Sequence, residues 1–416
     1  MRRRAFIKLG ITAALASIFS YYYLLNIREE IILPRLKLSG GHAYNDILYT
    51  NIKNISGHSS LLTIEDLSYI LWAAQGITEK ALLLRAAPSA GARYPMELFI
   101  FTGKSSVENL DRGIYHYNPY RHVLDRISYQ DCRKYLGVDD LEENDTLIVF
   151  NGVYDRTRAR YWFYFEKYVH IEVGHILLNV YLEAINLGID VKAYLDFNRG
   201  FVDRLVSLGK PLLAIRLRKL RGGFVDRCFE SGGGRFVNEV IARRRCIRDY
   251  RDDELTIDDL NSVLGILRRV YMGSPFMELP RRPIIHVAIG EVDGFSPGLY
   301  LYDVGLGKIV CVREGDQRGE LFKRSFYGLG IAPTWIKEGK MCIVVSVKTD
   351  PRDKYNLASM MSGGLLAQIL HLKTYDSDLA SVTVGGLYEE ELKNYLNLPE
   401  DYLSTHIIPI GRNKYG

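Results

Sequence analysis

The stretch from Arg85 to Pro95 carries residue types that suit the binding of a flat polar ligand. Pro88 and Pro95 fix the backbone torsion φ at two points of this stretch. The small residues Ser89, Ala90 and Gly91 between them leave the backbone uncovered. Such a loop can present N–H groups, the Ser89 hydroxyl and the Arg93 guanidinium to one ligand. On composition alone, a plain turn between a helix and a strand explains the same residues. The stretch reads Arg85, Ala86, Ala87, Pro88, Ser89, Ala90, Gly91, Ala92, Arg93, Tyr94 and Pro95.

A second candidate cluster is basic and lies in the other half of the chain, at residues 243–250, where the sequence is Arg-Arg-Arg-Cys-Ile-Arg-Asp-Tyr. Guanidinium groups suit a phosphate because they form forked, charge-assisted hydrogen bonds with its oxygens. Taken alone, the run fits a solvated basic face as well. The candidate contacts in it are Arg244, Arg245, Cys246 and Arg248.

Hydrophobic periodicity predicts the elements that would position these residues. The segment Ile64–Gln75 is typical of a helix ahead of the proline-bounded loop, and Met96–Thr102 is typical of a strand after it. From Val169 to Leu187, apolar residues recur every three or four positions, which indicates a long helix with an apolar stripe. A helix at an interface and an ordinary core helix explain that stripe equally well.

The two halves of the chain repeat one another. Leu62–Leu67 recurs as Leu255–Leu260, and each contains a Thr-x-x-Asp that is close to a capping box. Gly113–Tyr117 recurs as Gly298–Tyr302, with tyrosines in the period of two that marks a strand. The predicted units are an N-terminal segment at 1–30, a first domain at 50–221, a linker at 222–236 and a second domain at 237–416.

The loop sequence Pro-Ser-Ala-Gly-Ala-Arg-Tyr-Pro, followed by a glutamate-containing strand, resembles the SagB-type dehydrogenases, a branch of the nitroreductase-like flavoproteins. Ile70–Thr78, Gly113–Pro119 and Glu172–His175 match the same group in the same order. The resemblance covers Leu61 to Leu220 well, and a weaker copy follows. It implies an α+β fold class with a mainly antiparallel central sheet flanked by helices, here as two tandem domains that form an intrachain pseudo-dimer.

Nitroreductase-like proteins are usually homodimers that hold flavins across the subunit interface, so the resemblance implies FMN as the cofactor. One subunit gives an arginine-rich segment, a Gly-Gly turn and a basic tail, and its partner gives the proline-serine loop. Here the second half has the first set and the first half has the loop, which predicts one working FMN site and one degenerate site. The expected contacts are Pro88, Ser89, Ala90, Gly91, Arg93, Arg244, Arg245, Cys246, Arg248, Gly385, Gly386, Arg412 and Lys414.

Several positions depart from the family pattern. Cys246 stands where serine is usual, so one hydroxyl contact is absent. The equivalent of the Gly-Gly turn in the first half is Leu195–Phe197, whose side chains would block a close backbone approach. The first half has Asn51–Ser56 where an arginine pair is expected, and the second half has Gly273–Pro283 in place of the loop. Each half therefore lacks what the other retains.

The chemistry implied by the resemblance is hydride transfer at the flavin, with the protein supplying placement and electrostatics. A backbone N–H at Gly385 is expected near flavin N5, and Arg93 is a candidate donor near N1 and O2. In azoline-oxidising members, a Lys-Tyr pair is associated with proton removal from the substrate, and it aligns with Arg160 and Tyr161. Arginine is no general base at ordinary pH, because its pKa exceeds ~12.

Tyr161 could still act as the base if neighbouring cations lowered its pKa, and a packed interface tyrosine fits the position as well. Glu172 and His175 lie one helical turn apart and are expected to be structural.

The N-terminal segment reads as a separate module. Four basic residues precede an uncharged apolar run, Leu9–Ile27, which is close to the about 20 residues that span a bilayer. Arg3–Lys8 resembles a twin-arginine export signal, and a signal anchor that obeys the positive-inside rule is the alternative. We expect an apolar N-terminal helix, an export signal or membrane anchor, with the catalytic part outside the cytoplasm.

Composition narrows the function classes. A net charge of +5 is too mild to suggest a nucleic-acid partner. The five cysteines are scattered and form no Cys-x-x-Cys, which argues against a zinc site and a full disulfide framework.

The sequence therefore predicts an exported FMN oxidoreductase that transfers a hydride to or from an unidentified small-molecule or peptide substrate, with a quinone or another redox partner exchanging electrons. An azoline dehydrogenase that forms azoles in a modified peptide is the enzymatic alternative. A flavin-binding module without turnover, and a structural protein with two dead sites, are the others.

Overall fold

The computed structural model describes residues 29–49, 59–221, 234–273, 282–326 and 332–415. The predicted N-terminal apolar helix, the stretch Asn51–Ser56, most of the linker at 222–236 and most of Gly273–Pro283 lie outside the described residues. Of the helices in the described ranges, none has the length and apolar character needed to cross a membrane.

The first half of the chain forms one sheet in which all neighbouring strands are antiparallel. Every residue of the two central strands is buried, so both faces of the sheet are covered there. Across the sheet the strands are β1 (Glu30–Ile32), β7 (Val123–Ser128), β6 (Gly113–Asn118), β5 (Met96–Thr102), β8 (Thr146–Gly152), β10 (Lys210–Leu220) and β2 (Ser59–Ser60), with β9 (Ile189–Tyr194) also paired to β10.

The second half forms another antiparallel sheet with the same strand order. The strands β14, β13, β12, β15, β17 and β11 take the places of β7, β6, β5, β8, β10 and β2, and β16 flanks β17 as β9 flanks β10. Their bounds are β14 (Lys308–Glu314), β13 (Gly298–Asp303), β12 (Ile284–Ile289), β15 (Met341–Lys348), β17 (Tyr402–Asn413), β11 (Tyr250–Arg251) and β16 (Leu379–Ser381).

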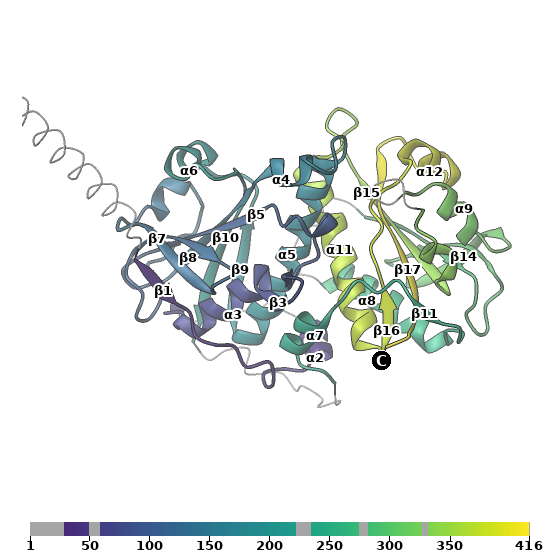
Figure 1. Ribbon diagram of the computed structural model, residues 1–416, viewed down its shortest axis with the longest axis horizontal. Coiled ribbons are helices and arrows are strands. Elements are labelled where there is room, and N and C mark those ends of the chain that lie inside the picture. The colour runs from purple at the N-terminus through teal and green to yellow at the C-terminus, as the bar shows by residue number, and fades with distance from the viewer. Residues whose placement is uncertain (1–28, 50–58, 222–233, 274–281, 327–331, 416) are drawn as a thin grey trace, which may run out of the picture.

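The helices cover the faces of both sheets (Figure 1). A small hairpin of β3 (Ile77–Glu79) and β4 (Leu84–Arg85) precedes the proline-bounded loop. The helices are α2 (Tyr44–Tyr49), α3 (Ile64–Gln75), α4 (Tyr154–Arg158), α5 (Phe165–Leu187), α6 (Arg199–Leu205), α7 (Val237–Arg243), α8 (Ile257–Gly273), α9 (Arg318–Lys323), α10 (Trp335–Glu338), α11 (Leu357–Asp376) and α12 (Glu389–Tyr395).

Local contacts repeat between the halves as well. The Thr63 hydroxyl accepts a hydrogen bond from the Asp66 N–H at 3.0 Å, and the Asp66 carboxylate accepts one from the Thr63 N–H, which completes the predicted capping box at the start of α3. Thr256 and Asp259 make the same pair of bonds at the start of α8. The two halves therefore share these hydrogen bonds as well as the repeated sequence.

The long helices α5 and α11 lie side by side between the two sheets, as Figure 1 shows. Glycines allow their backbones to approach closely. A Cβ on Gly174 would lie 2.0 Å from the carbonyl oxygen of Met361, and a Cβ on Gly364 would lie 2.0 Å from that of Ile171. Residues of both helices belong to one continuous apolar core. The face of α5 that carries Ile171, Gly174 and Leu178 therefore packs at an interface between the halves of one chain. The predicted stripe from Val169 to Leu187 packs instead into the core of the first half.

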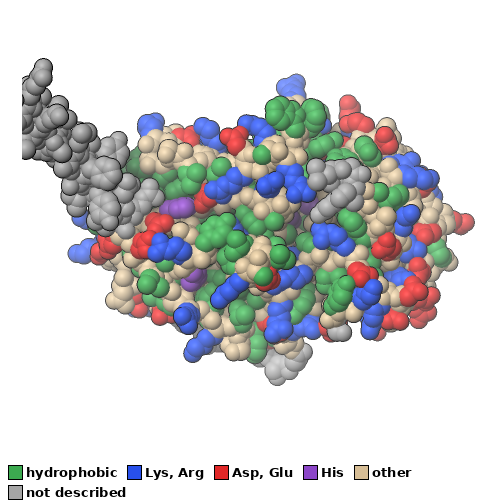
Figure 2. All heavy atoms as spheres, viewed as in Figure 1, with side chains coloured by type: hydrophobic (Ala, Val, Ile, Leu, Met, Phe, Trp, Pro, Cys, Tyr) green, Lys and Arg blue, Asp and Glu red, His purple; other side chains and the backbone are tan. Residues whose placement is uncertain are grey.

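Charged side chains of both signs are interspersed over the face drawn in Figure 2, with apolar side chains scattered between them. This face carries no broad field of a single charge.

Candidate functional site

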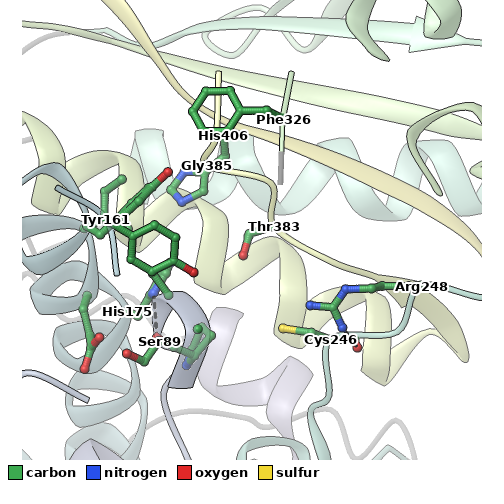
Figure 3. A pocket seen from close by; sticks show the side chains of 16 residues that line it. Ser89, Tyr161, His175, Cys246, Arg248, Phe326, Thr383, Gly385 and His406 are labelled. Atoms are coloured by element: carbon green, nitrogen blue, oxygen red, sulfur yellow. Dashed lines mark hydrogen bonds between the residues drawn. The ribbon is translucent and has the colours of Figure 1, made fainter. Parts of the chain in front are cut away.

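A cavity of about 100 Å³ lies between the two halves. Figure 3 shows side chains from both halves around it. From the first half, the lining residues are Pro88, Ser89, Ala90, Gly91, Tyr161, Tyr168, Ile171, Glu172 and His175. From the second half, they are Cys246, Arg248, Phe326, Thr383, Gly385, Gly386 and His406.

The proline-bounded loop is held in an unusual backbone conformation. Gly91, Ala92 and Tyr94 have φ values of +60°, +53° and +44°, in the left-handed region that only glycine adopts without strain. The Ser89 hydroxyl accepts a hydrogen bond from the Tyr94 N–H at 2.8 Å, which closes the loop. A Cβ on Gly91 would lie 2.7 Å from the Tyr161 hydroxyl oxygen, so the glycine also leaves room for that side chain.

A buried polar network supports this loop from the first half. The Gln75 amide donates to the Glu172 carboxylate at 3.4 Å, and Arg85 donates to the Gln75 carbonyl oxygen at 2.6 Å. Burial raises the pKa of Glu172 to about 7, against the lowering effect of the Ser89 hydroxyl and the Arg85 charge. Glu172 is the one carboxyl group among the described residues that line the cavity.

His175 has a defined tautomer. Its Nδ1 lies 3.2 Å from the Pro88 carbonyl oxygen, which can only accept, so Nδ1 carries the proton. That leaves Nε2 as a buried acceptor with no partner in the described part of the chain. Burial lowers the pKa of His175 to about 3, with a further contribution from His371. The sequence predicts structural roles for Glu172 and His175, whereas both side chains reach the cavity wall.

The raised pKa of Glu172 predicts a pH-dependent stability. Its folded-state pKa of about 7 lies above the ordinary 4.5, so the folded chain retains a proton that the unfolded chain releases. Stability therefore falls as the pH rises from about 4.5 to about 7, by up to about 3 kcal/mol. Glu172→Gln removes this loss, and we expect the variant to be more stable than the unmodified protein at pH 8 but not at pH 4.5, as measured by chemical denaturation.

Glu183 supplies a matched control for this prediction. It lies on the same helix, its pKa is also raised to about 7 by burial, and it does not line the cavity. Glu183→Gln should give the same gain in stability at pH 8 without any effect on ligand binding. A pH profile of stability unchanged by Glu172→Gln would contradict the prediction.

The opposite wall is formed by the Gly385–Gly386 turn. A Cβ on Gly385 would lie 2.9 Å from the Tyr168 ring, and one on Gly386 would lie 2.2 Å from the Phe326 carbonyl oxygen. No described residue accepts a hydrogen bond from either glycine N–H. The turn therefore has two backbone N–H groups without a described acceptor next to the cavity.

Of the four candidates in the basic cluster, only Cys246 and Arg248 line the cavity. The Arg244 guanidinium is buried and donates to the Ala86 carbonyl at 3.4 Å, and that of Arg245 donates to the Thr78 carbonyl at 3.0 Å. Both arginines thus bind backbone of the first half. Their observed contacts join the two halves and leave Arg248 as the cation on the cavity wall.

The basic tail does not line the cavity, in contrast to the prediction for Arg412 and Lys414. Arg412 pairs with Asp259, the capping residue of α8, at 2.6 Å. In the first half, Lys219 pairs with the capping residue Asp66 at 3.1 Å in the same way. Lys414 pairs with Asp249 at 2.9 Å. The pairs of Arg412 and Lys219 connect the last strand of each half, β17 or β10, to the first turn of α8 or α3. The basic residues at the end of each half therefore have ion-pair partners.

The three remaining candidates differ in whether they reach the cavity, and only Tyr161 lines it. Arg93 is exposed and does not line the cavity, in contrast to its predicted role as a donor. Arg160 lies outside the cavity lining, with its guanidinium 5.7 Å from the Tyr161 ring centre. The Tyr161 side chain lines the cavity and packs edge-on against Tyr168, with ring centres 4.9 Å apart.

Several cavity residues escaped prediction from the sequence. Tyr168, Phe326, Thr383 and His406 line the wall without belonging to a motif. A signal existed for His406, because Ser404, Thr405 and His406 are consecutive buried polar residues ahead of the apolar run that begins at Ile407 in strand β17. Polar residues inside a buried strand often indicate a site.

The residues around the cavity fit a flat, anionic cofactor such as FMN. Gly91, Gly385 and Gly386 leave backbone uncovered at the wall, and Arg248 supplies a positive charge there. The unpartnered Nε2 of His175 is a further polar atom that a ligand could satisfy. Fold and cavity together define a protein of the nitroreductase type.

Comparison with known proteins identifies the family. Residues 58–210 match the Nitroreductase family model. A nitroreductase-like protein of Methanocaldococcus jannaschii is 36% identical over 146 residues, which cover 33% of this chain and 72% of that protein. The chain belongs to the nitroreductase family.

Two further relatives carry the names of processing proteins. The trifolitoxin-processing protein TfxB of Rhizobium leguminosarum is 26% identical over 137 residues, which cover 30% of this chain and 36% of TfxB. The microcin B17-processing protein McbC of Escherichia coli is 22% identical over 178 residues, which cover 41% of this chain and 65% of McbC. The resemblance to the SagB-type branch is confirmed.

A solved structure extends the fold to both halves. A nitroreductase-like protein of Anabaena variabilis superimposes with a TM-score of 0.71 at 18% identity and covers 94% of this chain and 93% of its own. The second half, which the family model does not match, therefore shares the fold as well.

Proposed function

We propose that this protein is an FMN-dependent oxidoreductase with one FMN site, in the cavity between its two halves. The observation that carries the proposal is that the Ser89 loop of the first half and the Gly385–Gly386 turn of the second half line the same cavity. FMN, when bound, supplies hydride transfer. Arg248 would hold its anionic end, and the glycine N–H groups would donate hydrogen bonds to its ring.

The substrate is proposed to be a small molecule or a peptide. The peptide alternative draws on TfxB and McbC, whose names assign them to the processing of trifolitoxin and microcin B17. Arg160 weakens that alternative, because arginine cannot remove a proton at ordinary pH. We further propose that the segment 1–30 exports or anchors the protein and that a quinone or another redox partner exchanges electrons with it.

The absorption spectrum of the purified protein, with flavin counted per chain, tests the FMN site. We expect one FMN per chain. Arg248→Met should weaken FMN binding about 10-fold or more, because a hydrogen bond to a charged group contributes roughly 1.5–3 kcal/mol. Lys414→Met is the control, because that lysine pairs with Asp249 away from the cavity wall and should leave the affinity unchanged. Colourless protein that binds no added FMN would refute the proposal.

A yellow protein that every tested donor fails to reduce would instead favour a flavin-binding module without turnover. Formation of azoles in an azoline-containing peptide would favour the azoline dehydrogenase.

A further inference from the structure

Lys167 makes an unusual contact at the junction of the two halves. It lies on α5 of the first half, and its side chain is fully buried. Its ammonium group lies 3.0 Å from a carboxylate oxygen of Glu389 and 3.4 Å from the carbonyl oxygens of Gly385 and Ser404, all in the second half. A lysine is rarely buried completely unless it is paired, and here the pair joins the two halves.

Burial lowers the pKa of Lys167, and the Glu389 carboxylate opposes that effect. Burial alone would raise the pKa of Glu389, but Lys167 and Lys354 together hold it below the ordinary range. Lys354 reaches the other carboxylate oxygen at 3.1 Å from the solvent side, and its side chain is about half exposed.

One of the two carbonyl groups that accept from Lys167, that of Gly385, belongs to the peptide group between Gly385 and Gly386. The N–H of the same planar group is that of Gly386, because C=O and N–H of one peptide are fixed relative to each other. Gly386 lines the cavity, and no described residue accepts its N–H. A cation on the oxygen of a peptide polarises it and makes its N–H a stronger donor.

We propose that Lys167 is a positioning residue that fixes the Gly385–Gly386 peptide with its oxygen turned to the ammonium group and its N–H available to the cofactor. This inference rests on the proposed FMN site. A polarised donor beside the flavin ring favours the reduced, more negatively charged form over the oxidised one. Lys167 therefore makes bound FMN easier to reduce without touching FMN or substrate.

A merely structural ion pair would stabilise the fold and leave the turn and the flavin unaffected. Two variants separate these roles. Lys167→Met removes the charge and retains the length of the side chain, and Lys167→Met combined with Glu389→Gln also removes the carboxylate that would be left behind. Lys354→Met is the matched control, because it takes away the other lysine of Glu389 without touching Gly385.

The first readout is hydrogen exchange in FMN-free protein. The Phe326 N–H donates to the Gly386 carbonyl at 2.9 Å, and the Val384 N–H donates to the Ile407 carbonyl at 2.8 Å, so both amides report on the turn. We expect both to exchange about tenfold faster in the two Lys167 variants and at an unchanged rate in Lys354→Met.

The second readout is the equilibrium between oxidised and reduced FMN against a reference dye. We expect the Lys167 variants to shift it about tenfold toward the oxidised form, which is a potential 29.6 mV more negative for a two-electron couple. Unchanged exchange and an unchanged potential would overturn the inference, as would failure of both variants to fold. If the protein binds no FMN, the proposed function fails, and hydrogen exchange alone decides the role of Lys167.

Discussion

Replacing Gly174 by valine is expected to separate the two halves of the protein. The new Cβ would lie 2.0 Å from the Met361 carbonyl oxygen and 2.7 Å from the Leu365 nitrogen, so α5 and α11 must move apart. Overpacking costs about 1–3 kcal/mol where side chains can adjust, and here the obstacle is backbone, so we expect a loss of about 3 kcal/mol or more. The cavity should lose its shape with the interface, and FMN binding should disappear.

Thermal unfolding and FMN titration check this prediction, with Gly265→Val as the control. Gly265 is an exposed glycine of α8, and a Cβ there meets no atom within 4 Å. We expect the control to retain both stability and FMN binding. Full stability of the Gly174 variant would show that the two helices do not pack as closely as described.

Replacing Gly385 by valine should remove FMN binding while preserving the fold. The Cβ would lie 2.9 Å from the ring of Tyr168, which itself lines the cavity, so the added side chain would occupy space at the cavity wall. We expect FMN affinity to fall at least about 100-fold, or about 2.7 kcal/mol, since a ring cannot approach a backbone that a branched side chain covers.

Circular dichroism and FMN titration distinguish this outcome from misfolding. Gly319→Ala is the control, because a Cβ at Gly319 in α9 has no neighbour within 4 Å. Normal FMN affinity in the Gly385 variant would place the flavin elsewhere and contradict the proposed site.

Local elements could be predicted from the sequence because their signals are local. The bounds of α3 and β5 agree with the prediction, since the Thr63 capping box and the following prolines define where each begins and ends. The interface role of α5 needed the structure. Its apolar stripe packs into the core of the first half, and the contact with α11 is made by another face of the helix, where Gly174 lies.

The placement of residues at the cavity was predicted better where a motif provides backbone than for charged side chains, of which Arg248 reaches the cavity wall. Ser89, Gly91, Gly385 and Gly386 all line the cavity. Arginine and lysine bind whichever carboxylate the fold brings near, and Arg412 meets Asp259.

Lys167 was not singled out from the sequence, because its partner is distant along the chain. On a helix, a lysine is usually solvated, and nothing in the neighbouring sequence reveals that its partner, Glu389, lies in the other half.

The presence of both sheets in one polypeptide has a consequence for diluted protein. Two separate subunits must meet before they can share a cavity, and association costs them several kilocalories per mole of translational and rotational freedom. When two domains are covalently connected, they meet intramolecularly. The effective concentration of one relative to the other is then in the millimolar range for short flexible linkers in general. The affinity of this protein for FMN, if it binds at the proposed site, should therefore not depend on the protein concentration. Each half was also free to change without altering its counterpart, which a homodimer encoded by one sequence cannot do.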